Sequence, residues 1–421
     1  MKRSLLVFGL ILGLVFWVNP WVYAQSVEEE LIDLNERIEE LKNKIESADK
    51  ETDEISKISD HLNIGGGITS VVQATAGNDD HPEGEVQDGS YSVDIELEID
   101  LEKWGTAFIH MEGGEGDSVT DEFEALTGVN ADALGGDNRF DIIEAWWEFS
   151  RMDEKLTLTF GKIDPAGIWD TNVVADDECC QFMADIFTDQ ACMEWPDYTP
   201  GIRCLITPND SMDINIGLLS ADNDWEDLFE DVFGITEINI KPKFDDKEGN
   251  YRFYVWFNAL DHIEWDDLFD GIIQDTKENW GIGLSFDQEV SKDVTLFCRF
   301  GIQDSDIAGV SFDPGEGEVL EPFAIESSWS IGGQITGSPW DRSNDVVGAA
   351  IGQVILSDDY EDILDAGGID PENEFHLEVY YNYYLNDYIA VSADIQVIES
   401  IGGNEDADTV SIFGVRTQIS F

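Results

Sequence analysis

The segment from Val93 to Leu101 alternates apolar and acidic side chains without a break, and this pattern constrains the fold more than any other feature. The acidic set is Asp94, Glu96, Glu98 and Asp100. A period of two places the apolar and acidic sets on opposite faces of one β-strand. Both a water-soluble sandwich and a membrane barrel contain such strands, so the number and spacing of further strands must decide between them.

Similar alternation recurs in nine later segments. They are residues 143–149, 156–160, 214–218, 251–257, 280–286, 294–302, 377–385, 389–397 and 410–421. Compact links, as at 291–293 and 386–387, contrast with long Asp- and Gly-rich stretches at 113–138, 220–235, 259–276, 303–325 and 357–373. Short turns at one end and long loops at the other are typical of outer-membrane barrels.

The length of the alternating region predicts the size of the barrel. About 360 residues follow residue 61, and roughly 22 residues for each strand with its connection give about 16 strands. The sequence therefore predicts an all-β fold, a transmembrane antiparallel β-barrel of about 16 strands over residues 61–421, with an aqueous lumen and outer-membrane lipid around it.

Residues 1–24 have the features of an export signal. Met1-Lys2-Arg3 is basic, Leu5 to Val18 is apolar, and Val22-Tyr23-Ala24 fits a cleavage site with small residues. The apolar run is shorter than the roughly 20 residues that a spanning helix needs. We therefore expect cleavage before Gln25 and a bacterial outer-membrane location.

Residues 25–60 are predicted to form a short coiled-coil helix in the periplasm. Apolar residues follow each other at gaps of four and three, namely Val27, Leu31, Leu34, Ile38, Leu41 and Ile45. Such a helix could join copies of the chain into a homo-oligomer or contact the cell wall. The alternative is a helix that folds back on the mouth of the barrel.

The charge excludes one class of partner. With 91 Asp and Glu against 22 Lys and Arg, the net charge of -69 excludes nucleic-acid binding, since phosphates need cationic partners.

The five histidines show no metal-site or catalytic-triad spacing, and no nucleotide motif is present. We therefore expect no enzyme activity, no cofactor and no metal site.

Five cysteines in an exported chain leave one over after pairing. Cys192 and Cys204 are candidates for a disulfide across a loop that contains proline, whereas the neighbours Cys179 and Cys180 are too close to bond without strain. Metal binding is the competing interpretation, but the adjacent cysteines lack the usual two-residue gap.

Three separated blocks resemble the carbohydrate-selective porins of the OprB type. They are Gly161-Lys162-Ile163-Asp164-Pro165 followed by Asp170, then Pro339-Trp340-Asp341-Arg342-Ser343-Asn344-Asp345, and finally Gly414-Val415-Arg416 with Phe421. The resemblance implies an outer-membrane barrel for the passive uptake of sugars and similar small polar solutes. The acid excess is larger than the resemblance leads us to expect.

Parity assigns candidate pore-lining residues, because the apolar set of each strand must face lipid and the other set must face the lumen. These are Asp94, Glu96, Glu98, Asp100, Glu144, Trp146, Glu148, Arg252, Tyr254, Trp256, Arg299, Glu378, Asp394, Gln396 and Arg416. Carboxylates and arginines beside aromatic faces suit the hydroxyl pairs and C–H patches of sugars. The acid excess predicts a lumen that favours cations.

Two other functions compete with sugar diffusion. The acidity also fits a porin for metal cations or metal chelates. The N-terminal helix also fits a structural tether between the outer membrane and the cell wall.

Overall fold

The computed structural model describes residues 61–77, 84–122, 125–133, 140–226, 228, 230–265, 276–310 and 323–421. The chain divides into two compact units, and the second, Asn63–Phe421, contains the fold. The predicted export signal and coiled-coil helix lie outside the described residues.

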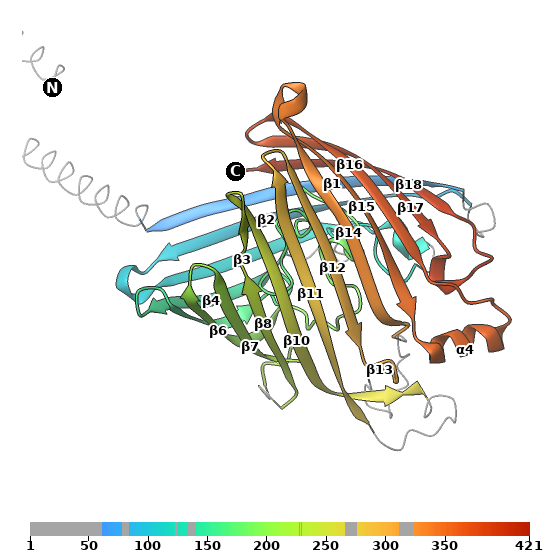
Figure 1. The fold of residues 1–421 in the computed structure, drawn as a ribbon, viewed down its shortest axis with the longest axis horizontal. Helices are drawn as coiled ribbons and strands as arrows, with labels where there is room; N and C mark the ends of the chain where they lie inside the picture. The colour runs from blue at the N-terminus through green and yellow to red at the C-terminus, as the bar shows by residue number, and fades with distance from the viewer. Residues whose placement is uncertain are drawn as a thin grey trace, which may run out of the picture. The chain divides into compact units, whose positions relative to one another are not determined.

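Sixteen antiparallel strands form a closed ring (Figure 1), which confirms the predicted barrel. Strands that are consecutive in the ring pair with each other, and β1 (Leu62–Ala76) closes it by pairing with β18 (Val410–Ser420). The others are β2 (Gln87–Asp100), β3 (Thr106–Glu115), β4 (Phe140–Arg151), β5 (Leu156–Ile163), β6 (Thr199–Asn209), β7 (Met212–Ser220), β8 (Val232–Ile240), β10 (Lys247–Glu264), β11 (Lys277–Ser291), β12 (Val294–Gln303), β14 (Ile325–Gly337), β15 (Arg342–Leu356), β16 (Phe375–Asn386) and β17 (Ile389–Glu399).

Two short strands and several helices lie at the ends of the barrel or inside it. The strands β9 (Lys243–Phe244) and β13 (Ile307–Val310) both pair with β10. The helices are η1 (Glu102–Trp104), η2 (Val119–Glu122), α2 (Asp185–Thr188), η3 (Ser338–Trp340), α4 (Asp358–Gly367) and η4 (Ile401–Gly403). No helix among the described residues is long and apolar enough to cross a membrane.

The connections alternate between short and long around the ring, as the sequence predicts. The short ones include 101–105, 152–155, 210–211, 292–293 and 387–388. The long ones include 116–139, 265–276, 304–324 and 357–374, and the segment 164–198 between β5 and β6. This last segment, which alternation did not single out as a loop, organises the lumen.

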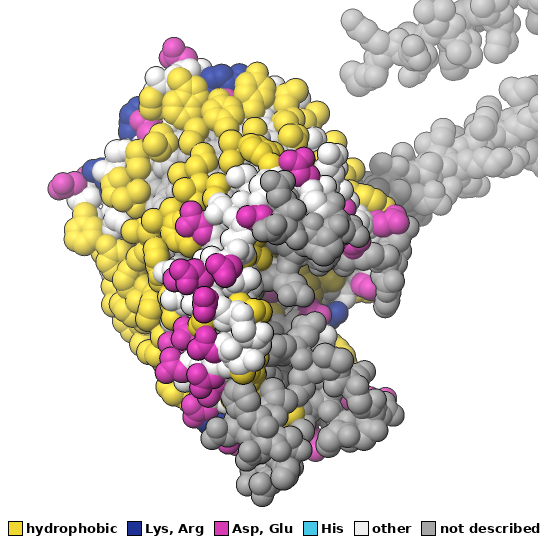
Figure 2. Space-filling view, turned by 90° about the vertical axis from the view of Figure 1, so that its right-hand side faces the viewer, with side chains coloured by type: hydrophobic (Ala, Val, Ile, Leu, Met, Phe, Trp, Pro, Cys, Tyr) yellow, Lys and Arg dark blue, Asp and Glu magenta, His cyan; other side chains and the backbone are white. Residues whose placement is uncertain are grey.

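Apolar and polar side chains sort to opposite faces of the wall. Val72, Val255 and Phe413 point outward and are all more than half exposed, and Figure 2 shows the broad hydrophobic surface that such residues form. Inward residues such as Ser285 and Gln396 are buried. A closed sheet with an apolar exterior is the arrangement that leaves no unpaired strand edge in lipid.

The hydrophobic core lies inside the barrel, because residues 164–198 fold back into the lumen (Figure 1). In one cluster, loop residues that include Phe182, Ile186 and Phe187 pack on Phe297 and Tyr380 of the wall. In the second cluster, Trp169 and Met193 of this segment pack with Ile163, the last residue of β5, against the wall of β7, β8 and β10. Burial of this apolar area favours the inward position of the loop at about 25 cal/mol per Å².

Gly217 on β7 lets the loop approach the wall closely. A Cβ atom at this position would lie 2.5 Å from the Trp169 ring and 2.9 Å from Ile235. Any larger residue would push Trp169 away from the strand, so the absence of a side chain here is part of how the loop is seated.

Candidate functional site: the lumen and its inward loop

Asp170 is the main polar anchor of the inward loop. Arg299 on β12 donates from Nε to Asp170 Oδ2 at 2.9 Å and from Nη2 to the Asp170 carbonyl at 3.0 Å. The Tyr254 hydroxyl donates to Asp170 Oδ1 at 3.0 Å, and the Asp170 amide donates to Glu237 at 3.0 Å. Arg299 also donates to the Phe187 carbonyl at 2.7 Å, so one arginine holds two points of the loop.

Two further wall residues bind loop backbone directly. The Glu378 carboxylate on β16 accepts from the amides of Met183 at 2.7 Å and Ala184 at 3.0 Å. Arg416 on β18 donates to the carbonyls of Glu178 and Gln181, the latter at 2.7 Å. Hydrogen bonds to charged groups contribute more than neutral ones, and these are sheltered from water.

A second connection, residues 116–139, also reaches into the lumen. The Val129 carbonyl accepts from Gln73 of β1 at 2.8 Å and from Gln396 of β17 at 2.9 Å. Ser92 of β2 donates to Asp132 at 2.7 Å. The described part of this segment therefore occupies the β17, β18, β1 and β2 side of the barrel, opposite the Asp170 anchor.

The wall formed by β2, β3 and β4 remains partly open and carries an aromatic pair. Phe108 of β3 and Trp146 of β4 stack with ring centroids 4.8 Å apart and planes at 25°. Trp146 Nε1 donates to Glu144 at 3.0 Å. In the pairing of β2 with β3, Glu98 lies opposite Phe108. Carboxylates therefore border this half-buried aromatic pair.

His110 lies one lumen-facing position further along β3. Its Nε2 lies 3.0 Å from Asp94 and its Nδ1 lies 3.4 Å from Glu144. Its ring centroid is 6.3 Å from that of Phe108. The imidazole of His110 therefore lies between the aromatic pair and a group of acidic side chains further along β3.

That acidic region is an open cavity of about 470 Å³ between the β1–β3 wall and the tip of the inward loop. Its lining includes six acids, Asp94, Glu96, Glu112, Asp132, Asp177 and Glu178. Burial raises the pKa of Asp132 to about 6 and that of Glu178 to about 8. Both groups therefore change charge near neutral pH. No group of three or more His, Cys, Asp or Glu side chains in the described part of the chain could hold a metal ion.

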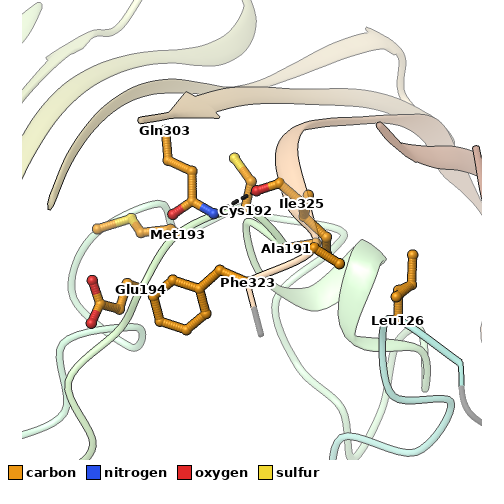
Figure 3. Close-up of a pocket in the computed structure, with 9 residues that line it drawn as sticks. Leu126, Ala191, Cys192, Met193, Glu194, Gln303, Phe323 and Ile325 are labelled. Carbon is orange, nitrogen blue, oxygen red and sulfur yellow. Dashed lines mark hydrogen bonds between the residues drawn. The ribbon is translucent and has the colours of Figure 1, made fainter. Parts of the chain in front are cut away.

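A second, smaller hollow of about 200 Å³ lies beside β12 and β14 (Figure 3). Its lining includes Cys192, Met193 and Phe323, and Gln303 donates to the Ile325 carbonyl at 2.5 Å. At one side, Glu194 lies 2.9 Å from Nε2 of the buried His262. The contact of Glu194 with His262 attaches the end of the inward loop to β10.

Comparison with known proteins identifies the family. The model of the carbohydrate-selective porins, OprB family, matches residues 86–421. The chain belongs to the OprB family.

The OprB assignment agrees with the fold of solved structures. The high-pH structure of Pseudomonas putida OprB has a TM-score of 0.72 at 15% identity, covering 87% of this chain and 96% of that one. The low-pH structure of the same protein has a TM-score of 0.55 at 13% identity, with 87% and 95% covered. The outer-membrane channel DcaP of Acinetobacter baumannii has a TM-score of 0.50 at 13% identity, with 86% and 97% covered. A comparison with curated proteins found no match.

This OprB chain is therefore an outer-membrane porin for sugars. Neither alternative function, metal uptake or tethering to the cell wall, gains support from the comparisons.

The structure divides the fifteen predicted pore-lining residues of this porin into two groups. All lie on inward-facing strand positions, but eight are buried beneath or beside the inward loops: Arg252, Tyr254, Trp256, Arg299, Glu378, Asp394, Gln396 and Arg416. The other seven lie on the open β2 and β4 wall: Asp94, Glu96, Glu98, Asp100, Glu144, Trp146 and Glu148. In the first group, Arg299, Glu378 and Arg416 bind the inward loop, whereas the second group lies on the part of the wall that the inward loop leaves open.

The predicted disulfide is wrong. All five cysteines are free. Cys192 is buried in the lumen, whereas Cys204 on β6 lies opposite Ile216, which is exposed on the outer face. The neighbour of Cys204, Arg203, points inward and lies 3.3 Å from Glu148. Because successive side chains of a strand point to opposite faces, Cys204 points outward and the barrel wall separates the two thiols.

Several residues of the OprB lumen were not predicted, among them Phe108, Asp132 and the anchor Asp170. One signal could have indicated the inward loop. Residues 164–198 contain Trp169, Phe182 and Phe187 with no strand periodicity. Large apolar residues in a non-strand segment must be covered, and a barrel offers cover only in its lumen.

Proposed function

We propose that this porin conducts small carbohydrates passively along the open β2–β4 wall and past the tip of the inward loop, and that its passage favours cations. The observation that carries this proposal is the distribution of charge in the lumen. Acids line the open wall and the cavity, while the arginines that could balance them are used elsewhere.

Four arginines of the described chain point into the lumen. Arg252 pairs with Asp287 at 2.7 Å with both side chains buried, and Arg299 and Arg416 are buried in the loop anchors. Arg203 alone of these is partly accessible, and it pairs with Glu148. A passing ion therefore meets carboxylates in excess, and like charge repels anions.

The aromatic pair and its flanking acids supply weak contacts for a sugar. A pyranose ring can place its C–H face on Phe108 and Trp146 while its hydroxyls donate to Glu98 or Glu144. Contacts of this kind are exchangeable, and conduction requires binding weak enough to permit exit. The process needs no chemical step, so we infer that the chain is not an enzyme.

Two measurements test the proposal. Liposome swelling should show entry of neutral monosaccharides, and the reversal potential across a planar bilayer in a KCl gradient should show K⁺ passing in preference to Cl⁻. Anion selectivity would refute the charge argument. Cation flux without any sugar entry would instead favour the metal-cation alternative.

The predicted helix at residues 25–60 remains a proposal from the sequence. We propose that it lies in the periplasm and joins copies of the chain or contacts the cell wall. Deleting residues 26–58 should change oligomer size or envelope integrity while leaving sugar entry intact. Loss of sugar entry in a correctly assembled barrel would contradict this separation of roles.

A further inference from the structure

His110 on β3 lies between two carboxylates of the neighbouring strands. Its Nε2 is 3.0 Å from Asp94 Oδ1 on β2, and its Nδ1 is 3.4 Å from Glu144 Oε1 on β4. The three side chains are each between 15% and 19% exposed, so solvent screens these contacts only in part. Both ring nitrogens therefore face an acidic oxygen.

This arrangement determines how many protons the ring carries. A neutral imidazole has one N–H group and one lone pair, so it could donate to one carboxylate only, and its lone pair would face the other. Moving a proton to one of the carboxyl groups instead is unfavourable, because an imidazole is the stronger base. Only the doubly protonated ring presents an N–H group to both Asp94 and Glu144.

The surroundings of His110 are acidic and supply no second base. The lining of the adjoining cavity contains no Lys or Arg among the residues that the structure describes. The titratable groups around the ring are Asp94 and Glu96 of β2, Glu112 of β3, Glu144 of β4, Asp132 of the segment 116–139, and Asp164, Asp177, Glu178, Cys179, Cys180 and Tyr198 of the inward loop.

His110 also lies on the path that we propose for solutes. It lines the cavity, and its ring centroid is 6.3 Å from that of Phe108. A passage whose acids were all unpaired would hold cations tightly, whereas conduction requires binding weak enough to permit exit. An imidazolium at this position pairs with two of the acids and places one positive charge beside the others.

We propose that His110 is a specificity-determining residue of this porin, a fixed positive charge that limits the preference of the passage for cations. This inference rests on the proposed cation-favouring passage and names the residue that moderates it. Loss of the charge would leave Asp94 and Glu144 unpaired, so the preference for cations would increase.

Replacement of His110 at pH 7 tests the charge. His110→Gln removes the positive charge and keeps a polar side chain, whereas His110→Arg keeps the charge. In a KCl gradient across a planar bilayer, the ratio of K⁺ to Cl⁻ permeability should increase severalfold in His110→Gln and stay close to the unaltered value in His110→Arg. Lys292→Gln is the matched control, since it removes an exposed cation from the β11–β12 turn and should leave the ratio unchanged.

The pH dependence of the unaltered protein is a second measurement. The imidazolium loses its proton as the pH rises, so the K⁺ preference should increase at alkaline pH and approach that of His110→Gln. His110→Arg shares every other titrating group but keeps its charge, so it should lack this additional increase. Entry of neutral glucose, measured by liposome swelling, should persist in each protein. Heat-dependent electrophoretic migration verifies that each variant is folded.

The possible failures are distinguishable. If His110→Gln has the unaltered ratio at pH 7 while His110→Arg has a lower one, the ring is neutral in the passage, and the inference is overturned while cation passage stands. An alkaline increase of equal size in the unaltered protein and in His110→Arg would also overturn it. A preference of the unaltered protein for Cl⁻ would refute the proposed cation-favouring passage itself.

Discussion

At the residue scale, inward-facing position and solute contact prove to be separate properties. Parity placed Arg299 on the lumen face, and the structure agrees, but Arg299 is 2% exposed and bonded to Asp170. Alternation depends only on which face a strand buries, so it cannot reveal what lies above that face. The partner comes from residue 170, which is distant in sequence and belongs to no strand.

Arg299→Ala should release the inward loop. Removing one partner of a buried ion pair leaves Asp170 uncompensated and costs about 3 to 5 kcal/mol where both groups are sheltered. We expect a larger and noisier single-channel conductance and new protease cleavage within residues 164–198. Lys243→Ala is the matched control, since it breaks an exposed pair with Glu248. Unchanged conductance in Arg299→Ala would show that the apolar clusters alone hold the loop.

At the element scale, the ten segments that alternate clearly are all strands, and two of the strands that the alternation did not predict, β14 and β15, have an identifiable reason. β14 and β15 place Ser328, Ser330, Gly348 and Gly352 on the inward face. These small residues make room for the loop and for Tyr380, whose ring would meet any Cβ atom at Gly348. The inward and outward faces of β14 and β15 therefore differ too little in hydropathy for the sequence to reveal an alternation. The choice of inward residue is determined by a tertiary contact.

Replacing residues 170–190 with a short Gly/Ser linker should open the lumen without preventing barrel assembly. The strand pairing does not depend on the loop, whereas the two apolar clusters do. We expect a severalfold increase in conductance and loss of discrimination between glucose and larger oligosaccharides, measured in planar bilayers and by liposome swelling. A chain that fails to form a heat-modifiable barrel would instead show that the loop is needed for folding.

At the scale of the whole molecule, the net charge of -69 becomes a property of the passage because acids line the cavity while the lumen arginines are buried. Composition alone predicts the sign of this field. Composition does not predict where in the molecule the negative charge is concentrated. That depends on the inward folding of residues 164–198, which have no strand periodicity.

Cation selectivity should decline between pH 8 and pH 6. A carboxyl group is charged only above its pKa, and burial raises the pKa of Glu178 to about 8 and that of Asp132 to about 6. Lowering the pH from 8 to 6 neutralises most of Glu178 and about half of Asp132, so the K⁺ preference in a KCl gradient should fall well above the ordinary carboxylate range near pH 4. Selectivity that stays constant down to pH 5 would contradict a role for these two groups.

The pairing of β1 with β18 brings together residues from the two ends of the barrel sequence, such as Thr69 and Gln418, which are 349 positions apart. Until β1 and β18 pair, the sheet has two edge strands whose backbone amides and carbonyls have no hydrogen-bond partners. Such unpaired groups are energetically too costly in the hydrocarbon core of a membrane. Insertion into the membrane is consequently cooperative. The edge of β1 must be protected from lipid until β18 has formed and pairs with it.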